Sequence, residues 1–214
     1  MGMFFVGIFL IAFVASSAVS FVLMIQRFRK NLLGDEAYLS MMIPVSVTQQ
    51  VFSKLFVSLV WYLLVGVVMV AGVGIAVLDL ETLGIMGDVF KTFVQIWGMG
   101  NVVHGAVKLL VLFLVGMAFL NLQFYASLAI GHSFNKYKLA CSVAVYVVIQ
   151  IILSALSTGN LMLMGRMVQA GQAYMTDLEL FSKMLSGVTI LSFIYAAVFY
   201  VITVYFLKKH FNVE

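Results

Sequence analysis

The feature that most limits how this chain can fold is the length of its apolar runs. Five runs approach or exceed the about 20 residues that a helix needs to cross about 30 Å of hydrocarbon. They cover residues 3–25, 55–78, 109–130, 139–157 and 184–207. Hydrophobic residues make up 64% of the 214-residue chain and charged residues 9%, whereas soluble domains carry about 25% charged residues. A soluble domain could not bury so much apolar surface, so we expect an all-α, polytopic transmembrane helical bundle that forms a single domain.

The chain carries few of the side chains that catalysis or metal binding requires. Cys141 is the only cysteine and lies in an apolar run, which excludes an intrachain disulfide and a cysteine-based metal cluster. His104, His132 and His210 are far apart and lack a second ligand at helical spacing. There is no G-x-x-x-x-G-K-[ST] motif to hold nucleotide phosphates, no H-E-x-x-H motif and no paired carboxylates. We therefore expect no enzymatic activity and no cofactor or metal bound by this chain.

The basic residues are divided unequally between alternate connections of the apolar runs. One set carries Arg27, Arg29, Lys30, Lys54, Lys136, Lys138, Lys208 and Lys209, and the other carries Lys91, Lys108, Arg166 and Lys183. The positive-inside rule places the richer set in the cytoplasm, which puts the N-terminus outside the cell membrane and the C-terminus inside. Because this asymmetry also accounts for the net charge of +4, nucleic acid is not an expected partner.

The later connections between the runs differ in character. Residues 79–103 contain an amphipathic stretch, VFKTFVQIW, that suits a position in the membrane interface or a re-entrant segment. Residues 132–138, HSFNKYK, form a short basic loop. Residues 158–183 are expected to form a longer polar loop before the last run.

The first connection, residues 26–54, is the long interval in the first half of the chain that cannot lie in lipid. Gly34 is expected to interrupt a helix that leaves the membrane. Asp35 and Glu36 then stand where a new helix would begin, with their charges favourably placed at its positive end. Pro44, the only proline, cannot continue that helix. The pattern predicts a short helix that ends before Pro44.

A second helix is predicted directly after this proline. The sequence Ser46-Val-Thr-Gln49 fits a capping box, in which the serine hydroxyl caps the helix and the glutamine side chain reaches back. This helix would enter the bilayer through Lys54. The whole interval would then be a small lever at the membrane surface that takes force from a partner protein. An interfacial loop with ordinary helix caps and no partner is the alternative.

Small residues mark one face of the first run. Ala12, Ser16 and Ser20 fall at i, i+4 and i+8, so they share a face on which another helix could approach closely. We expect this face to pack against a helix; a stripe that lines a pore is the alternative.

Four polar residues inside the spans are further candidates for function. Asn121, Gln123 and Tyr125 lie in the third run, and Gln150 lies in the fourth. Placing such groups in hydrocarbon is costly unless they pair or line a cavity. Hydrogen bonding between helices is the favoured interpretation, because such side chains hold many membrane helices together. A substrate path is the alternative.

The first connection also carries a resemblance to a known family. The sequence RFRKNLLGDEAYLSMMIPVSVTQQVFSKLFVSLVW, residues 27–61, resembles a segment of bacterial ABC transporter permeases of the type-2 exporter class, especially those of Gram-positive bacteria. The shared residues are Arg27, Phe28, Lys30, Asn31, Leu32, Gly34, Asp35, Glu36, Tyr38, Leu39, Pro44, Val45, Ser46, Ser53, Lys54, Leu55 and Trp61. A weaker similarity covers residues 131–148 and 205–214.

The resemblance implies a membrane subunit that works with a separate ATP-binding subunit, which would hold ATP and Mg²⁺. The element that couples the two would lie within residues 34–46 and would include Gly34, Asp35, Glu36, Tyr38, Leu39, Pro44, Val45 and Ser46. It also implies a second permease subunit, identical or different, and export of an amphipathic or hydrophobic substrate such as a peptide, drug or lipid.

The chain departs from the family in one respect. The family usually has six spans and a cytoplasmic N-terminus, whereas this chain lacks a helix before its first run. Either the sequence is a shortened form or this branch works with five spans. The departure keeps a second function open, that of a non-transporting scaffold or sensor subunit that binds a partner through residues 26–54.

Overall fold

The fold is a bundle of long helices. The computed structural model describes residues 2–34, 42, 45–76, 84, 87–88, 90–92, 94–95, 98–134, 136–171 and 177–209, in places by their backbone alone. The long helices are α1 (Gly2–Leu32), α3 (Val47–Ala76), α5 (Met99–Gly131), α6 (Lys138–Gly171) and α7 (Asp177–Lys209). The all-α class predicted from the apolar runs is therefore confirmed.

Four segments of these helices are long and apolar enough to cross a membrane. They are Val47–Gly72, Met99–Gly131, Lys138–Asn160 and Glu179–Lys209. The chain is thus a multi-pass membrane protein. The first predicted run, 3–25, lies within α1, and its crossing of the bilayer stays a prediction.

The helices extend well past the apolar runs. The prediction of a polar loop over residues 158–183 was wrong, because α6 continues to Gly171 and α7 begins at Asp177. The physical reason lies in residues 159–171, where Leu, Met, Arg, Gln and Ala favour helix and no proline occurs. A helix of 34 residues is about 51 Å long at about 1.5 Å per residue, so α6 reaches beyond the hydrocarbon.

Helix α5 also starts earlier than the apolar run that it contains. Helix α5 begins at Met99, so the last residues of the predicted interfacial segment 79–103 belong to it. Gly98 precedes the helix with a positive φ of 76°, a conformation that glycine adopts without steric cost. Described residues before it are helical in short pieces, among them Asp88 and Lys91, whose side chains form an exposed ion pair at 3.4 Å.

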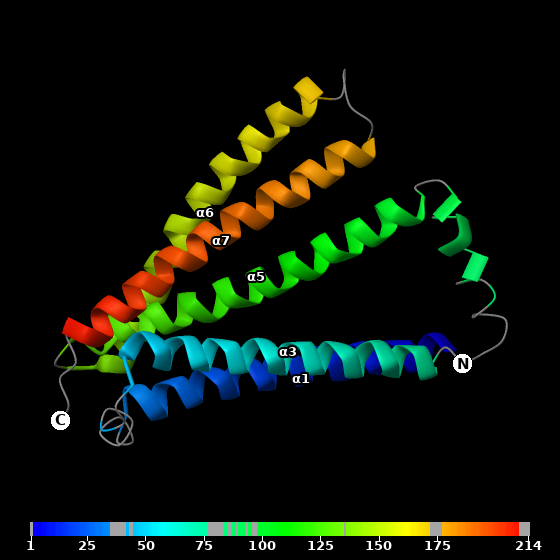
Figure 1. Ribbon diagram of the computed structural model, residues 1–214. Helices are drawn as coiled ribbons and strands as arrows, with labels where there is room; N and C mark the ends of the chain where they lie inside the picture. Colours follow the sequence, from blue (N-terminus) through cyan, green and yellow to red (C-terminus); the bar gives the residue numbers. More distant parts are fainter. Residues whose placement is uncertain are drawn as a thin grey trace.

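The helices converge at one end of the bundle and diverge at the other (Figure 1). The converging end gathers the end of α1, the start of α3, the end of α5, the start of α6 and the end of α7. Helix α5 runs through the middle and packs mainly against α7 and α6, while α1 packs mainly against α3. At the other end the α6–α7 hairpin lies well away from α1 and α3.

The buried core follows the same asymmetry. Its members come from the C-terminal halves of α1, α5 and α7 and from the N-terminal half of α3. They are Phe28, Leu32, Val51, Leu55, Leu122, Tyr125, Ala126, Leu128, Ala129, Ala196, Phe199 and Leu207. Many apolar side chains outside this core are exposed, as in Val70 at 75%, which suits a surface in contact with lipid. The converging end is therefore densely packed and the diverging end is open.

The small-residue face of α1 packs only in part. Ser20 is buried, and its hydroxyl accepts a hydrogen bond of 3.0 Å from the Trp61 indole of α3. Ser16 and Ala12, one and two turns earlier, are exposed.

Candidate functional site

The converging end carries the charge asymmetry seen in the sequence. It holds all eight basic residues of the richer set, Arg27, Arg29, Lys30, Lys54, Lys136, Lys138, Lys208 and Lys209. Lys108 and Lys183 lie toward the diverging end, where the Lys108 ammonium donates to the Ser182 hydroxyl at 2.6 Å. Consecutive connections between the helices thus lie at opposite ends of the bundle, as the sequence predicted. The side of the membrane that each end faces stays a prediction from the positive-inside rule.

The first helix ends where the sequence predicted an interruption. Helix α1 stops at Leu32, and the Leu33 amide still donates to the Arg29 carbonyl at 2.9 Å. A Cβ atom added at Gly34 would lie only 3.1 Å from the Lys30 carbonyl oxygen, which favours glycine at this position. The predicted coupling residues Asp35, Glu36, Tyr38, Leu39 and Pro44 lie outside the described residues.

The capping box at the start of α3 is confirmed. The Gln49 amide donates to the Ser46 hydroxyl at 3.3 Å, and the Ser46 amide donates to the Gln49 side-chain oxygen at 3.2 Å. The Ser46 hydroxyl also donates to that oxygen at 3.1 Å. Val45, one residue earlier, is exposed. The reciprocal pair satisfies two backbone amides that the helix leaves without partners, so it fixes where α3 begins.

A second contact joins the start of α3 to the last helix. The Tyr200 hydroxyl of α7 donates to the Thr48 carbonyl in the first turn of α3, at 3.0 Å. Val51, one turn further on, is fully buried in the core. Any displacement of the first turn of α3 must therefore move α7 or break this bond.

A polar hollow lies between α1 and α3 at the same end. Its volume is about 430 Å³, and its lining residues are Leu23, Gln26, Arg27, Lys30, Asn31 and Lys54. Three of the six carry positive charge, so the hollow suits an anionic group. It adjoins both ends of residues 26–54.

The turn between α5 and α6 completes this end of the bundle. The His132 Nδ1 atom lies 2.9 Å from the Leu128 carbonyl oxygen, to which it donates a hydrogen bond in the tautomer that is protonated on Nδ1. Burial lowers the pKa of the His132 imidazole, and the charges of Lys138 and Arg29 lower it further, whereas the bond to Leu128 acts in the opposite direction. The neutral ring therefore sits between basic residues of two different connections. The sequence placed His132 in the short basic loop 132–138 and gave it no role in metal binding, but did not predict its contact with Leu128.

Three of the four polar candidates in the spans are buried in the C-terminal half of α5. Asn121, Gln123 and Tyr125 are each at most 1% exposed. The Asn121 amide donates to the Met117 carbonyl of its own helix at 2.8 Å, while the Gln123 side-chain nitrogen has no hydrogen-bond partner among the described residues. The Tyr62 hydroxyl of α3 pairs with the Asn121 side chain, and the Tyr125 hydroxyl pairs with Ser58 of α3. These two contacts join α3 to α5, as expected for polar side chains that hold membrane helices together.

The fourth candidate lies apart from the other three. Gln150 on α6 donates from its amide to the Tyr146 hydroxyl, one turn earlier, at 2.7 Å. The Tyr146 ring stacks on Phe124 of α5 with centroids 4.4 Å apart. Gln150 is therefore connected to a different feature of the bundle, an apolar pocket.

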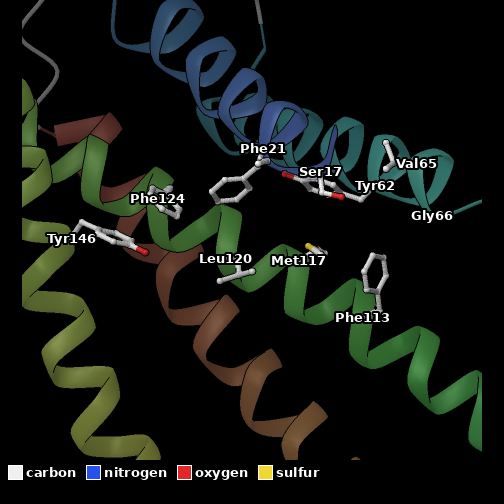
Figure 2. Close-up of a pocket in the computed structure, with 11 residues that line it drawn as sticks. Ser17, Phe21, Tyr62, Val65, Gly66, Phe113, Met117, Leu120, Phe124 and Tyr146 are labelled. Atoms are coloured by element: carbon white, nitrogen blue, oxygen red, sulfur yellow. The ribbon is translucent and has the colours of Figure 1, made fainter. Parts of the chain in front are cut away.

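This pocket opens among α1, α3, α5 and α6, beyond the core, and has a volume of about 400 Å³ (Figure 2). Its lining residues are Ser17, Ala18, Phe21, Tyr62, Val65, Gly66, Phe113, Met117, Leu120, Phe124 and Tyr146. Figure 2 shows the α5 side chains along one wall and those of α1 and α3 along the other. Sequence reasoning missed the pocket, because apolar residues repeated along one face of α5 look the same whether they face lipid or a cavity.

These features suit the docking of a partner and the binding of apolar molecules. Among the residues that the structure describes, no group of three or more His, Cys, Asp or Glu side chains is arranged to hold a metal ion. The arrangement instead offers a rigid basic end and an apolar pocket beyond it. Comparisons of the chain with protein families, with curated proteins and with solved structures gave no match.

Proposed function

We propose that this chain is the membrane-spanning subunit of an ATP-driven ABC exporter. A separate subunit would bind ATP and Mg²⁺, and this chain would convert its movement into transport of an amphipathic or hydrophobic substrate. One observation carries the proposal. Both ends of residues 26–54, which bear the resemblance to type-2 exporter permeases, emerge at the densely packed basic end, beside the 132–138 turn and the end of α7.

The packing of that end supports a mechanical role. The C-terminal half of α1 is stacked on α5 through Phe28 and Tyr125, and the start of α3 is bonded to α7 through Thr48 and Tyr200. A force applied to residues 26–54 therefore reaches α5 and α7 without passing through a loop. The helices would act as levers, and their diverging ends, which have fewer buried contacts, would move most.

The sealed core supports a partner in the membrane as well. At the converging end the interior is filled by buried side chains such as Tyr125 and Leu122, so the described helices leave no open passage there. A transport path would then form between this chain and a second permease subunit, of the same or a different sequence. The same observation favours the second candidate function, a non-transporting scaffold or sensor that binds its partner through residues 26–54.

The test is purification of the full chain in mild detergent, with identification of the proteins that accompany it. A variant with Asp35, Glu36 and Pro44 changed to alanine removes the charges and the break expected in the coupling element. A matched control changes Asp88 and Lys91 to alanine, because this exposed ion pair lies toward the other end. We expect an ATP-binding subunit with the natural chain and with the control, and its loss from the variant.

Two outcomes decide between the candidates. If no ATP-binding subunit accompanies any of the three proteins, the exporter proposal fails. If one does, the complex is reconstituted in vesicles and its ATPase activity is measured with apolar peptides or drugs. Stimulation by a substrate supports the exporter, whereas constant activity with every compound supports the scaffold.

A further inference from the structure

We propose that the pocket among α1, α3, α5 and α6 is a binding site for an uncharged, largely apolar molecule that carries one hydrogen-bond acceptor. The proposal rests on the proposed function only in treating this molecule as the cargo. Binding itself requires no ATP-binding subunit, so the two proposals can fail separately.

The size and lining of the pocket indicate the class of ligand. Its volume of about 400 Å³ falls within the about 300–1,000 Å³ typical of small-molecule sites. None of its eleven lining residues is charged. Because an ion placed in apolar surroundings without a partner loses much of its solvation energy, the pocket selects against charged molecules.

Aromatic rings gather at one end of the pocket (Figure 2). Phe21 of α1 meets Phe124 of α5 edge to face, with centroids 5.0 Å apart, and the Tyr146 ring of α6 stacks on the Phe124 ring. Rings arranged in this way offer both faces and edges to an apolar or aromatic ligand. Tyr62 contributes its ring to the wall while its hydroxyl is buried.

The polar edge of the pocket lies at Tyr146. Its hydroxyl accepts the Gln150 amide at 2.7 Å, and a tyrosine hydroxyl that accepts one hydrogen bond still has its own proton to donate. A carbonyl or hydroxyl oxygen of the ligand is the matching group. Gln150 holds the hydroxyl in place, which gives this half-buried polar residue a role in ligand orientation.

The test uses photoreactive probes on the full chain in discs of saturated phosphatidylcholine. Three probes share one diazirine-bearing alkyl chain and end in a hydroxyl, a carboxylate or a trimethylammonium group; a fourth has no head group. Labelled peptides are identified by mass spectrometry. We expect the alcohol to label residues 113–124, to be displaced by excess unlabelled alcohol, and to label several-fold more than either charged probe.

Two pairs of variants test the site itself. A Cβ atom added at Gly66 meets nothing within 4 Å, so Gly66→Leu fills the pocket without straining the backbone. Gly116 is also open but does not line the pocket, so Gly116→Leu is its control. We expect labelling by the alcohol to fall about tenfold or more in the first variant and to stay unchanged in the second.

The second pair of variants removes a tyrosine hydroxyl and keeps the aromatic ring. Tyr146→Phe should lower labelling by the alcohol about threefold to tenfold, the range for one hydrogen bond, and leave labelling by the headless probe unchanged. Tyr205→Phe makes the same chemical change on α7, away from the pocket.

Equal labelling by neutral and charged probes, insensitive to Gly66→Leu, would mean that bilayer lipid alone fills the pocket, and the proposal would fall. Labelling that follows the expected pattern in a chain that recruits no ATP-binding subunit would keep the binding site and reject the exporter. Recruitment of that subunit without selective labelling would reject the binding site and leave the exporter proposal standing.

Discussion

Phe28 of α1 lies face to face on Tyr125 of α5, with ring centroids 3.8 Å apart and ring planes 5° from parallel. Both side chains are at most 1% exposed. Helix α1 otherwise packs mainly against α3, so this pair and the contact of Phe21 with Phe124 join the first helix to the central one. The resemblance to exporter permeases includes Phe28, and its position explains why an aromatic residue is useful there: it anchors the end of the helix from which residues 26–54 emerge.

The first prediction concerns this joint. Phe28→Ala should lower the free energy of unfolding by about 3–5 kcal/mol, because it removes a fully buried ring and leaves a cavity in the core. The measurement is chemical or thermal unfolding of the purified chain in detergent. Phe56→Ala on α3 is the control, since that ring is 58% exposed. Similar losses in both variants would show that the stacked pair contributes nothing specific.

The second prediction concerns the capping box. Ser46→Ala removes the hydroxyl that accepts the Gln49 amide, and should cost about 1 kcal/mol. Hydrogen exchange should then be faster in the first turn of α3 and unchanged in the middle of the helix. In the control, Ser53→Ala, the lost hydroxyl bonds only the Gln50 carbonyl within the same helix, so the first turn should keep its protection.

The third prediction concerns the close approach of α5 and α6. A Cβ atom at Gly131 would overlap the Cα and Oγ atoms of Ser142, so Gly131→Ala must push the two helices apart. We expect a loss of about 1–3 kcal/mol, as for other overpacked sites. At Gly116, where a Cβ meets nothing within 4 Å, the same change should stabilise the chain by about 0.5–1 kcal/mol through helix propensity. Effects of the same sign would contradict the close approach.

The fold and the ends of its first connection were predictable because they depend on local rules. Apolar runs of membrane length require helices whatever their neighbours are. Ser46 and Gln49 satisfy each other's backbone amides within one turn, and Gly34 stops a helix where a Cβ would be crowded, so no distant contact decides either feature. The division of the basic residues between the two ends of the bundle likewise follows from the order of the connections along the chain.

The extent of the helices and the pocket were not predictable, for two different reasons. Hydropathy marks where a chain leaves the hydrocarbon. A helix, however, continues as long as its backbone hydrogen bonds do, so α6 extends beyond its apolar run. The pocket depends on how far the α1–α3 pair lies from α5, which no local pattern records. Tyr146 and Gln150 are spaced by four, which places them on one face and was the one sequence signal for the pocket.

The last prediction concerns pH and the turn at the converging end. The His132 pKa is lowered in the folded chain, by burial first and then by Lys138 and Arg29. In the unfolded chain the ring has its ordinary pKa of about 6.5. Above about pH 6.5 the ring is neutral in both states, and its contribution to stability is fully present. Below this pH the unfolded chain binds more protons than the folded chain. Stability therefore falls as the pH drops from about 6.5 toward the lower pKa of the folded chain.

Unfolding of the chain measured from pH 8 to pH 5 tests this sign. The natural protein should lose stability below about pH 6.5, and His132→Gln, which keeps a polar side chain but cannot be protonated, should lose less over the same range. His104→Gln, an exposed histidine earlier on α5, should keep the natural profile. A natural chain that gains stability on acidification would mean that the bond to Leu128 outweighs burial, and that His132 binds its proton more tightly when folded.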